Sequence, residues 1–196
     1  KSTMGKFSYR LYRSPIVLFL IGPAYVFLLE HRYPKGMTDK LKPWLTVMLT
    51  NLGIILVASL LVVSIGFSSF IAIQLPVTII AASLGVWLFY VQHQFEETVW
   101  DEKEDWDRRE AAMHGSSHYD LPLPLRWLSG NIGIHHVHHL SSHIPFYKLP
   151  QVLKDYPELK DISRLTLWES FKCVKLTLWD PKSYRLISFQ EAKAIA

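Results

Sequence analysis

With 196 residues, of which 49% are hydrophobic and 19% charged, the chain can form one soluble domain or a small membrane bundle. Its net charge of +4 does not indicate a nucleic-acid-binding protein, because the basic residues lie beside long apolar runs and not on one stripe with exposed aromatics. The single cysteine, Cys173, excludes an intrachain disulfide framework and a cysteine-based zinc site, and it fits a reducing compartment.

The N-terminal part divides into a basic, aromatic segment and a short apolar one. Residues 1–14 mix Lys and Arg with Phe, Tyr and Leu, which is typical of the interface between lipid headgroups and water, and we expect them on the cytosolic surface. Residues 15–29 are apolar but fall short of the roughly 20 residues that a helix needs to cross the hydrocarbon layer. Gly22-Pro23 also interrupts them. We therefore expect a re-entrant or in-plane segment, with a tightly fitted span as the alternative.

Two long uncharged stretches follow. Residues 44–66 contain Asn51 as their only strongly polar side chain, and residues 70–92 contain Gln74. Each stretch is long enough for a transmembrane helix, and the short connection between them predicts a helical hairpin. Basic residues precede and follow the pair but are absent from its tip, so both open ends and both termini are expected in the cytosol. The sequence thus predicts a multi-pass integral membrane protein.

The remaining residues, 93–196, are expected to form a mostly helical cytosolic cap, which makes the chain an all-α membrane protein. A charged surface helix is expected at residues 101–113. Residues 121–124 should be extended, because each proline disfavours helix at the residue before it. Irregular structure is expected between Pro145 and Pro157, and residues 166–178 show helical apolar spacing.

Histidines are concentrated in the string IHHVHHLSSH, which holds five of the nine between residues 135 and 143. On a helix, His135, His138 and His139 stand at positions i, i+3 and i+4, which places three imidazoles on one face. Imidazole suits iron, zinc, copper and nickel, and it can leave coordination positions open for oxygen or water. The string therefore predicts a metal site, and a histidine-rich surface without such a site is the alternative.

A further histidine, His93, directly follows the second apolar stretch, where the hairpin opens to the cytosol. It could bind the same metal ions, or it could be an interfacial side chain that reaches water. A ligating histidine can also be oriented by neighbouring polar groups. The candidates for that supporting role are Glu96, Glu97, Asn131, His136 and His143. For the two acids a solvated turn is the alternative, and His114 with His118 is a weaker metal pair.

Three segments together closely resemble the membrane fatty acyl desaturases, especially the bacterial and plant-type acyl-lipid members: LFYVQHQFEE, GSSHYDLPLPLRW and GNIGIHHVHHLSSHIPFYKL. The third histidine box of that family, His-x-x-His-His, matches His135, His138 and His139, and its extra histidine after the last transmembrane helix matches His93. The likeness runs from residue 7 to about residue 178. The family's first and second boxes have no counterpart here, so we expect residues 1–196 to be the C-terminal part of a single desaturase domain.

The resemblance implies a non-haem di-iron centre of two iron ions, and an enzyme that uses dioxygen and two electrons to introduce a cis double bond into a lipid acyl chain. Its ligands in this chain would be His93, His135, His138 and His139. A separate donor of the ferredoxin or cytochrome b5 kind would supply the electrons. Basic residues that could steer an acidic donor are Arg108, Arg109, Arg126 and Lys148. Without the first two boxes, the chain alone is expected to be inactive.

Two other functions fit the sequence. A membrane di-iron lipid or carotenoid hydroxylase or ketolase has a similar site, because the outcome depends on substrate placement. A non-catalytic membrane metal-binding or transport protein could use the histidine string as a cytosolic sensor. Transporters, however, generally place ionisable residues at mid-membrane depth, and the two spans offer only Asn51 and Gln74 with a few hydroxyls.

Overall fold

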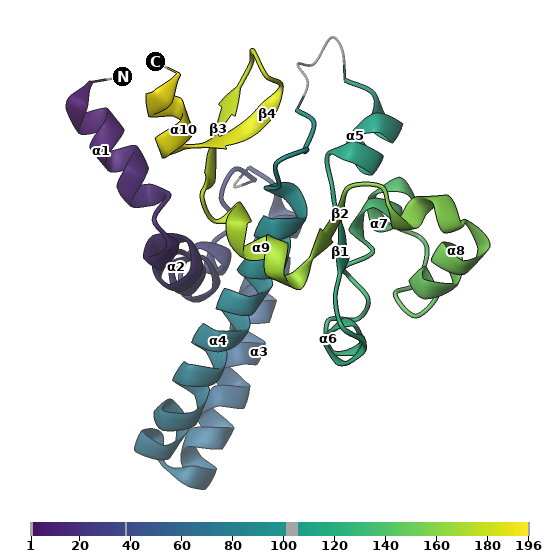
Figure 1. Cartoon of the computed structure of the whole chain (residues 1–196). Coiled ribbons are helices and arrows are strands. Elements are labelled where there is room, and N and C mark those ends of the chain that lie inside the picture. Colours follow the sequence, from purple (N-terminus) through teal and green to yellow (C-terminus); the bar gives the residue numbers. More distant parts are fainter. Residues whose placement is uncertain (1, 38, 101–105, 196) are drawn as a thin grey trace. The chain divides into compact units, whose positions relative to one another are not determined.

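The computed structural model describes residues 2–37, 39–100 and 106–195, and these are mostly helical (Figure 1). They divide into two compact units, Lys1–Trp87 and Leu88–Ala196, and the long helix α4 (Phe67–His93) runs from the first into the second. Each unit is held together by contacts among its own residues.

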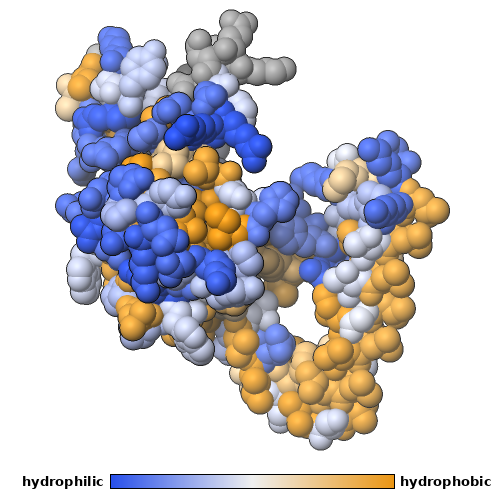
Figure 2. All heavy atoms as spheres, turned by 90° about the vertical axis from the view of Figure 1, so that its right-hand side faces the viewer, coloured by the Kyte–Doolittle hydropathy of each residue, from blue (hydrophilic) through white to orange (hydrophobic). Residues whose placement is uncertain are grey.

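All regular elements in the described part of the first unit are helical. Besides the start of α4, its elements are α1 (Thr3–Tyr12), the π-helical turn η1 (Val17–Ile21), α2 (Gly22–Leu28), the 3-10 turn η2 (Glu30–Arg32) and α3 (Leu41–Ile65). Both α3 and α4 are long and apolar enough to cross a membrane, in agreement with the two predicted transmembrane segments. No residue of α3 is buried, and hydrophobic side chains cover the helix pair (Figure 2). Lipid is the solvent that suits a helix that is apolar on all sides.

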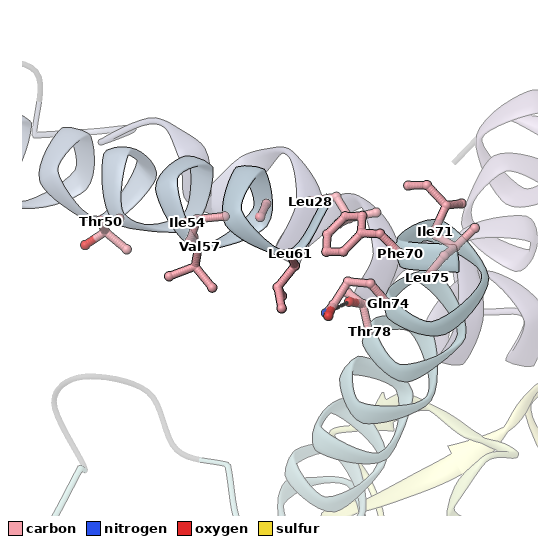
Figure 3. Close-up of a pocket in the computed structure, with 12 residues that line it drawn as sticks. Leu28, Thr50, Ile54, Val57, Leu61, Phe70, Ile71, Gln74, Leu75 and Thr78 are labelled. Atoms are coloured by element: carbon pink, nitrogen blue, oxygen red, sulfur yellow. Dashed lines mark hydrogen bonds between the residues drawn. The ribbon is translucent and has the colours of Figure 1, made fainter. Parts of the chain in front are cut away.

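A single residue, Gly66, joins α3 to α4. Its φ of 83° lies in the left-handed region, which glycine adopts without steric cost. Away from this joint the two helices diverge (Figure 3). Together with Leu28 of α2 they line an apolar cavity of about 650 Å³, with Ile54, Leu61 and Phe70 among its walls. The connection is as short as the predicted hairpin requires, but the two helices do not stay close together along their length, so a packed transmembrane hairpin stays a prediction.

The short apolar segment of residues 15–29 is helical, and Gly22-Pro23 changes its winding. The N–H of Gly22 donates to the carbonyl of Val17, five residues back, and Pro23 follows with no N–H to donate. A side chain on Gly22 would place a Cβ 2.8 Å from that carbonyl oxygen. Helix α1 and the run Val17–Arg32 are bent by 52° against each other. Both a re-entrant segment and a broken span are compatible with this bend, so the choice stays a prediction.

Two amide side chains within the long helices, Asn51 and Gln74, have hydrogen-bond partners in the first unit. Asn51 donates from Nδ2 to the carbonyl oxygen of Arg32 at 2.9 Å, and its Oδ1 accepts from the guanidinium of that arginine at 3.2 Å. Gln74 donates to the hydroxyl of Thr78 at 3.0 Å. These hydrogen bonds offset the cost of placing amides among apolar groups.

The second unit contains short helices and, contrary to the all-α prediction, four short strands. Its elements are α5 (Arg108–His114), β1 (His118–Asp120), α6 (Leu123–Leu128), α7 (His135–Leu140), α8 (Leu149–Asp155), η3 (Pro157–Lys160), β2 (Arg164–Thr166), α9 (Leu167–Cys173), β3 (Leu176–Asp180), β4 (Arg185–Ser188) and α10 (Phe189–Ala194). Strand β1 pairs with β2 in parallel, and β3 pairs with β4 antiparallel. The sheets were missed because strands this short carry little periodic signal.

Prolines explain two further differences from prediction. Residues 121–124 were expected to be extended, but only the first half is, and α6 begins at Leu123 with Pro124 in its first turn. Irregular structure was expected between Pro145 and Pro157, where α8 forms with Pro150 in its first turn. The N–H groups of a first helical turn have no partner within the helix, so a proline there costs nothing.

Helix ends in the second unit follow local caps. The surface helix predicted for residues 101–113 begins at Arg108, because Asp107 accepts hydrogen bonds from the N–H groups of the first turn; residues 101–105 lie outside the described residues. The helix predicted for residues 166–178 starts correctly, at a capping box of Thr166 and Glu169, but ends at Cys173. The residues from Leu176 onward pair with β4 instead.

A tight backbone contact fixes the start of α7 against β1. The N–H of Tyr119 donates to the carbonyl of Gly133 at 2.7 Å, and the next residue, Ile134, packs with Val137, Leu149 and Leu153 in a buried cluster. A Cβ on Gly133 would lie 2.3 Å from the carbonyl oxygen of Tyr119, closer than any real Cβ contact. Only glycine fits at this position.

Replacing Gly133 with alanine should therefore destabilise the second unit by about 1–3 kcal/mol, the usual cost of overpacking. The loss would appear as a lower midpoint of thermal unfolding in detergent. Gly53→Ala is the matched control, since a Cβ there meets nothing within 4 Å. An unchanged midpoint for Gly133→Ala would contradict the close approach of β1 and α7.

Candidate metal centre

His93 is the last residue of α4, and its ring is oriented by a backbone carbonyl. Its Nδ1 lies 3.1 Å from the carbonyl oxygen of Gly115. A carbonyl can only accept, so Nδ1 carries the proton in this contact and Nε2 of the neutral ring keeps a free lone pair. Metal-binding histidines are commonly oriented in this way. The ring of Phe89, one helical turn earlier, packs against His93 with centroids 5.0 Å apart.

Helix α7 supplies the other imidazoles. It follows a turn in which Gly130 and Asn131 have φ values of 60° and 57°, and the bridge between His118 and Ile134 sets its first residue. His135 at its start is buried, whereas His139 one turn later is exposed. The predicted i and i+4 relation thus places two imidazoles on the same face.

Three ring nitrogens converge. The Nε2 atom of His135 lies 3.0 Å from Nε2 of His93 and 3.0 Å from Nε2 of His139, and all three ligand atoms lie within 4.8 Å of one another. Imidazole nitrogens bind a divalent metal ion at about 2.1 Å, so two of them at right angles around one ion are about 3 Å apart. The ring centroid of His138 is 5.7 Å from that of His135, at the edge of this cluster. The structure thus brings together three of the four predicted ligands, and a ligand role for His138 stays a prediction.

The electrostatics of the cluster favour a metal ion over protons. Burial, together with the neighbouring rings of His93 and His139, lowers the pKa of His135 to about 3. Burial also lowers the pKa of His139. A neutral imidazole keeps a lone pair that can bind a metal ion. Nε2 of His135 lies between two other ring nitrogens and could share a proton with only one of them, whereas one metal ion can accept lone pairs from all three nitrogens. The buried Nδ1 of His135 has no hydrogen-bond partner among the described atoms. The donor set fits a transition metal such as iron.

The residues predicted to support the ligands make other contacts. Glu96 forms an ion pair with Arg185 at 2.6 Å, and both Glu96 and Glu97 line a small polar pocket. Asn131 donates to the carbonyl of Phe146 at 3.1 Å, and His143 is exposed. A supporting role for these residues therefore stays a prediction.

His136 and His118 form a second, fully buried pair whose role sequence reasoning did not recognise. Their ring centroids are 5.5 Å apart. His136 contacts the carbonyl of Leu159 through Nε2 at 2.9 Å, and His118 contacts that of Lys160 through Nδ1 at 2.6 Å. Burial lowers the pKa of both, that of His136 to about 4. Through these contacts His136 fastens α7, and His118 fastens β1, to residues 159–160. His114, the suggested metal partner of His118, lies instead beside Glu110.

A bridging segment, residues 115–120, contacts both the end of α4, which carries His93, and the start of α7, which carries His135. Its first residue contacts His93, and the N–H of Ser117 donates to the carbonyl of Gln92 at 3.0 Å. Its other half contacts Gly133 and pairs with Ile134. The segment takes part in all of these contacts through its backbone groups, so its residue types gave no signal for them.

Comparison with known proteins finds one family and one relative that cover this site. The sequence profile of the fatty acid desaturase family matches residues 1–170. A protein of Bacillus subtilis (strain 168) named fatty acid desaturase is 43% identical over 194 residues, which are 99% of this chain and 55% of that protein. The chain thus spans little more than half the length of this relative.

Removing one imidazole should weaken metal binding. We expect His139→Ala to reduce the affinity for Co²⁺ by about tenfold or more. Mutating the groups that only orient metal ligands typically weakens metal binding by about tenfold to a hundredfold, and removing a ligand itself should cost at least as much. His139 is exposed, so its loss leaves no cavity in the core. Titration of the Co²⁺ absorption bands would measure the change, with the exposed His143→Ala as control. Equal affinities of the two variants would refute the assignment.

Proposed function

The chain belongs to the fatty acid desaturase family, and we propose that it is part of a membrane fatty acyl desaturase that introduces a cis double bond into lipid acyl chains. The reaction takes two hydrogen atoms from adjacent methylene groups and, with dioxygen, two electrons and two protons, yields the alkene and two molecules of water. Two non-haem iron ions, when bound, supply the oxygen chemistry. The protein's part is to hold those ions and position the acyl chain.

The observation that carries this proposal is the convergence of three Nε2 atoms at 3.0 Å spacing at the end of an apolar helix. We assign His93, His135, His138 and His139 as iron ligands. Four imidazoles do not complete the coordination of two ions, so further ligands must come from another segment. The family's first and second histidine boxes are the natural source, and we expect this chain alone to be inactive.

An acyl chain has an apolar approach to these ligands. Helix α4 carries no charged residue from Phe67 to Gln92, and Phe89, which is 66% exposed, packs on His93. The helix end is also fastened: the hydroxyl of Tyr90 donates to the carbonyl of Leu176 at 3.2 Å. We propose that this part of α4 guides the chain from the bilayer to the metal centre, which lies on the cytosolic side.

The contacts of the polar residues in the spans argue against a transport protein. Asn51 and Gln74 are both hydrogen-bonded within the first unit. A transport pathway requires polar groups that are free to bind the transported ion. The desaturase proposal needs no such groups.

Electrons would come from a separate ferredoxin or cytochrome b5 type donor. Of the four basic residues considered for steering, Arg126 is held by Asp120 at 2.8 Å. Arg108 and Arg109 are exposed on α5, which packs beside α7. We propose that α5 contributes to the surface that meets an acidic donor.

The proposal predicts a loss of product when a ligand is removed. The full-length protein should be expressed in a host that lacks desaturases, and its acyl chains analysed by gas chromatography and mass spectrometry. We expect His139→Ala to lower the unsaturated product by about a hundredfold or more, while His143→Ala retains it. Iron content measured on the purified proteins should fall in parallel.

Three outcomes would contradict the proposal in different ways. An added oxygen atom in the product would indicate a hydroxylase or ketolase. If the acyl composition of cells that express the His139→Ala or the His138→Ala variant equals that of cells with the unsubstituted protein, the protein would be non-catalytic. Fewer than about one iron ion per chain after anaerobic loading of the full-length protein would exclude a di-iron centre.

A further inference from the structure

The second unit exposes a compact group of large apolar side chains around α6, here called the α6 patch: Leu123, Trp127, Leu128, Phe146 and Tyr147. Their exposed fractions run from 60% for Phe146 to 77% for Trp127. The two parts of the patch lie together, because a Cβ on Gly130 would be 3.6 Å from the ring of Phe146. Exposed apolar groups of this size, gathered in one place, mark a surface that binds something.

The orientation of α6 is fixed. Its arginine, Arg126, donates to Asp120 at 2.8 Å, and Asp120 also accepts from Arg164 at 2.7 Å. Arg126 therefore ties the helix to β1 and β2, while Leu123, Trp127 and Leu128 stay exposed. At the other end, Asn131 donates to the carbonyl of Phe146. The patch is a rigid surface and not a loose loop.

The charge around the patch complements a lipid surface. The 34 residues 121–154 contain no Asp or Glu, whereas they contain Arg126, Lys148 and Lys154. Trp and Tyr are enriched where headgroups meet hydrocarbon, and nearby Lys residues favour anionic lipid.

We propose that the α6 patch inserts into the interface between lipid headgroups and hydrocarbon, so that the metal-binding unit rests on a lipid bilayer. The inserted depth would be the roughly 5–10 Å typical of in-plane amphipathic helices. This contact would fix the height of α7 above the membrane, because α6 and α7 are joined by a turn of six residues, 129–134. It does not depend on which reaction the metal centre catalyses.

Spin labels can test this insertion. Single cysteines at Trp127→Cys and Leu128→Cys would be labelled in the protein reconstituted into nanodiscs of phosphatidylcholine and phosphatidylglycerol. The native Cys173 is buried and its pKa is raised to about 12 by burial, so it should not react. The unsubstituted protein checks for background labelling. Tyr184→Cys, in the turn between β3 and β4, is the control for a residue that is equally exposed but flanked by polar residues.

The measurement is the ratio of collisions with oxygen, which concentrates in lipid, to collisions with a water-soluble nickel chelate. We expect this ratio to be several-fold higher at positions 127 and 128 than at position 184. Equal ratios would place the patch in water and overturn the proposal. Low access to both reagents would show that protein covers the patch, either an upstream segment or a second copy, and would equally overturn it. A Phe146→Cys label gives an independent reading if a variant in α6 fails to fold.

Discussion

The placement of the metal ligands depends on one backbone constraint, the hydrogen bonding of residues 115–120 to two distant parts of the chain. On one side this segment accepts from His93 and donates to Gln92, and on the other it donates to Gly133. The end of a membrane helix and the start of α7 are thereby held against the same six residues. Backbone groups that are already fixed in a helix or a strand lose little further conformational entropy when they form such a hydrogen bond, whereas a flexible side chain loses more. Contacts through the backbone therefore hold these parts of the chain firmly in place. Three ring nitrogens can then converge although α7, which carries two of them, is only six residues long.

The chemistry of the cluster follows from burial. In water an imidazole is protonated near pH 6.5, but burial lowers the pKa of His135 to about 3 and that of its neighbour His136 to about 4. The two rings have different tasks. His135 presents Nε2 to two other rings, whereas His136 faces away and is bonded to Leu159. A single helical turn therefore carries a candidate metal ligand, His135, on one face and an anchoring residue, His136, on the other.

Sequence reasoning succeeded where one strong signal decides. Uninterrupted apolar runs predicted α3 and α4, because hydrocarbon accepts only long stretches without charge. Helical spacing predicted that His135 and His139 share a face, and the position of His93 at a helix end suggested that it joins them. The short strands, the helices that begin at Pro124 and Pro150, and the bridging segment were not foreseeable, since tertiary contacts decide them. The pairing of Glu96 with Arg185, 89 residues apart, is of the same kind.

The central claim is that His93, His135 and His139 bind one metal ion. An anomalous difference map at the iron absorption edge, from crystals of the iron-loaded full-length protein, tests it directly. The account predicts a peak within about 2.1 Å of the Nε2 atoms of these three residues. A peak bonded to other residues, or His93 turned away from an ion held by α7, would contradict it.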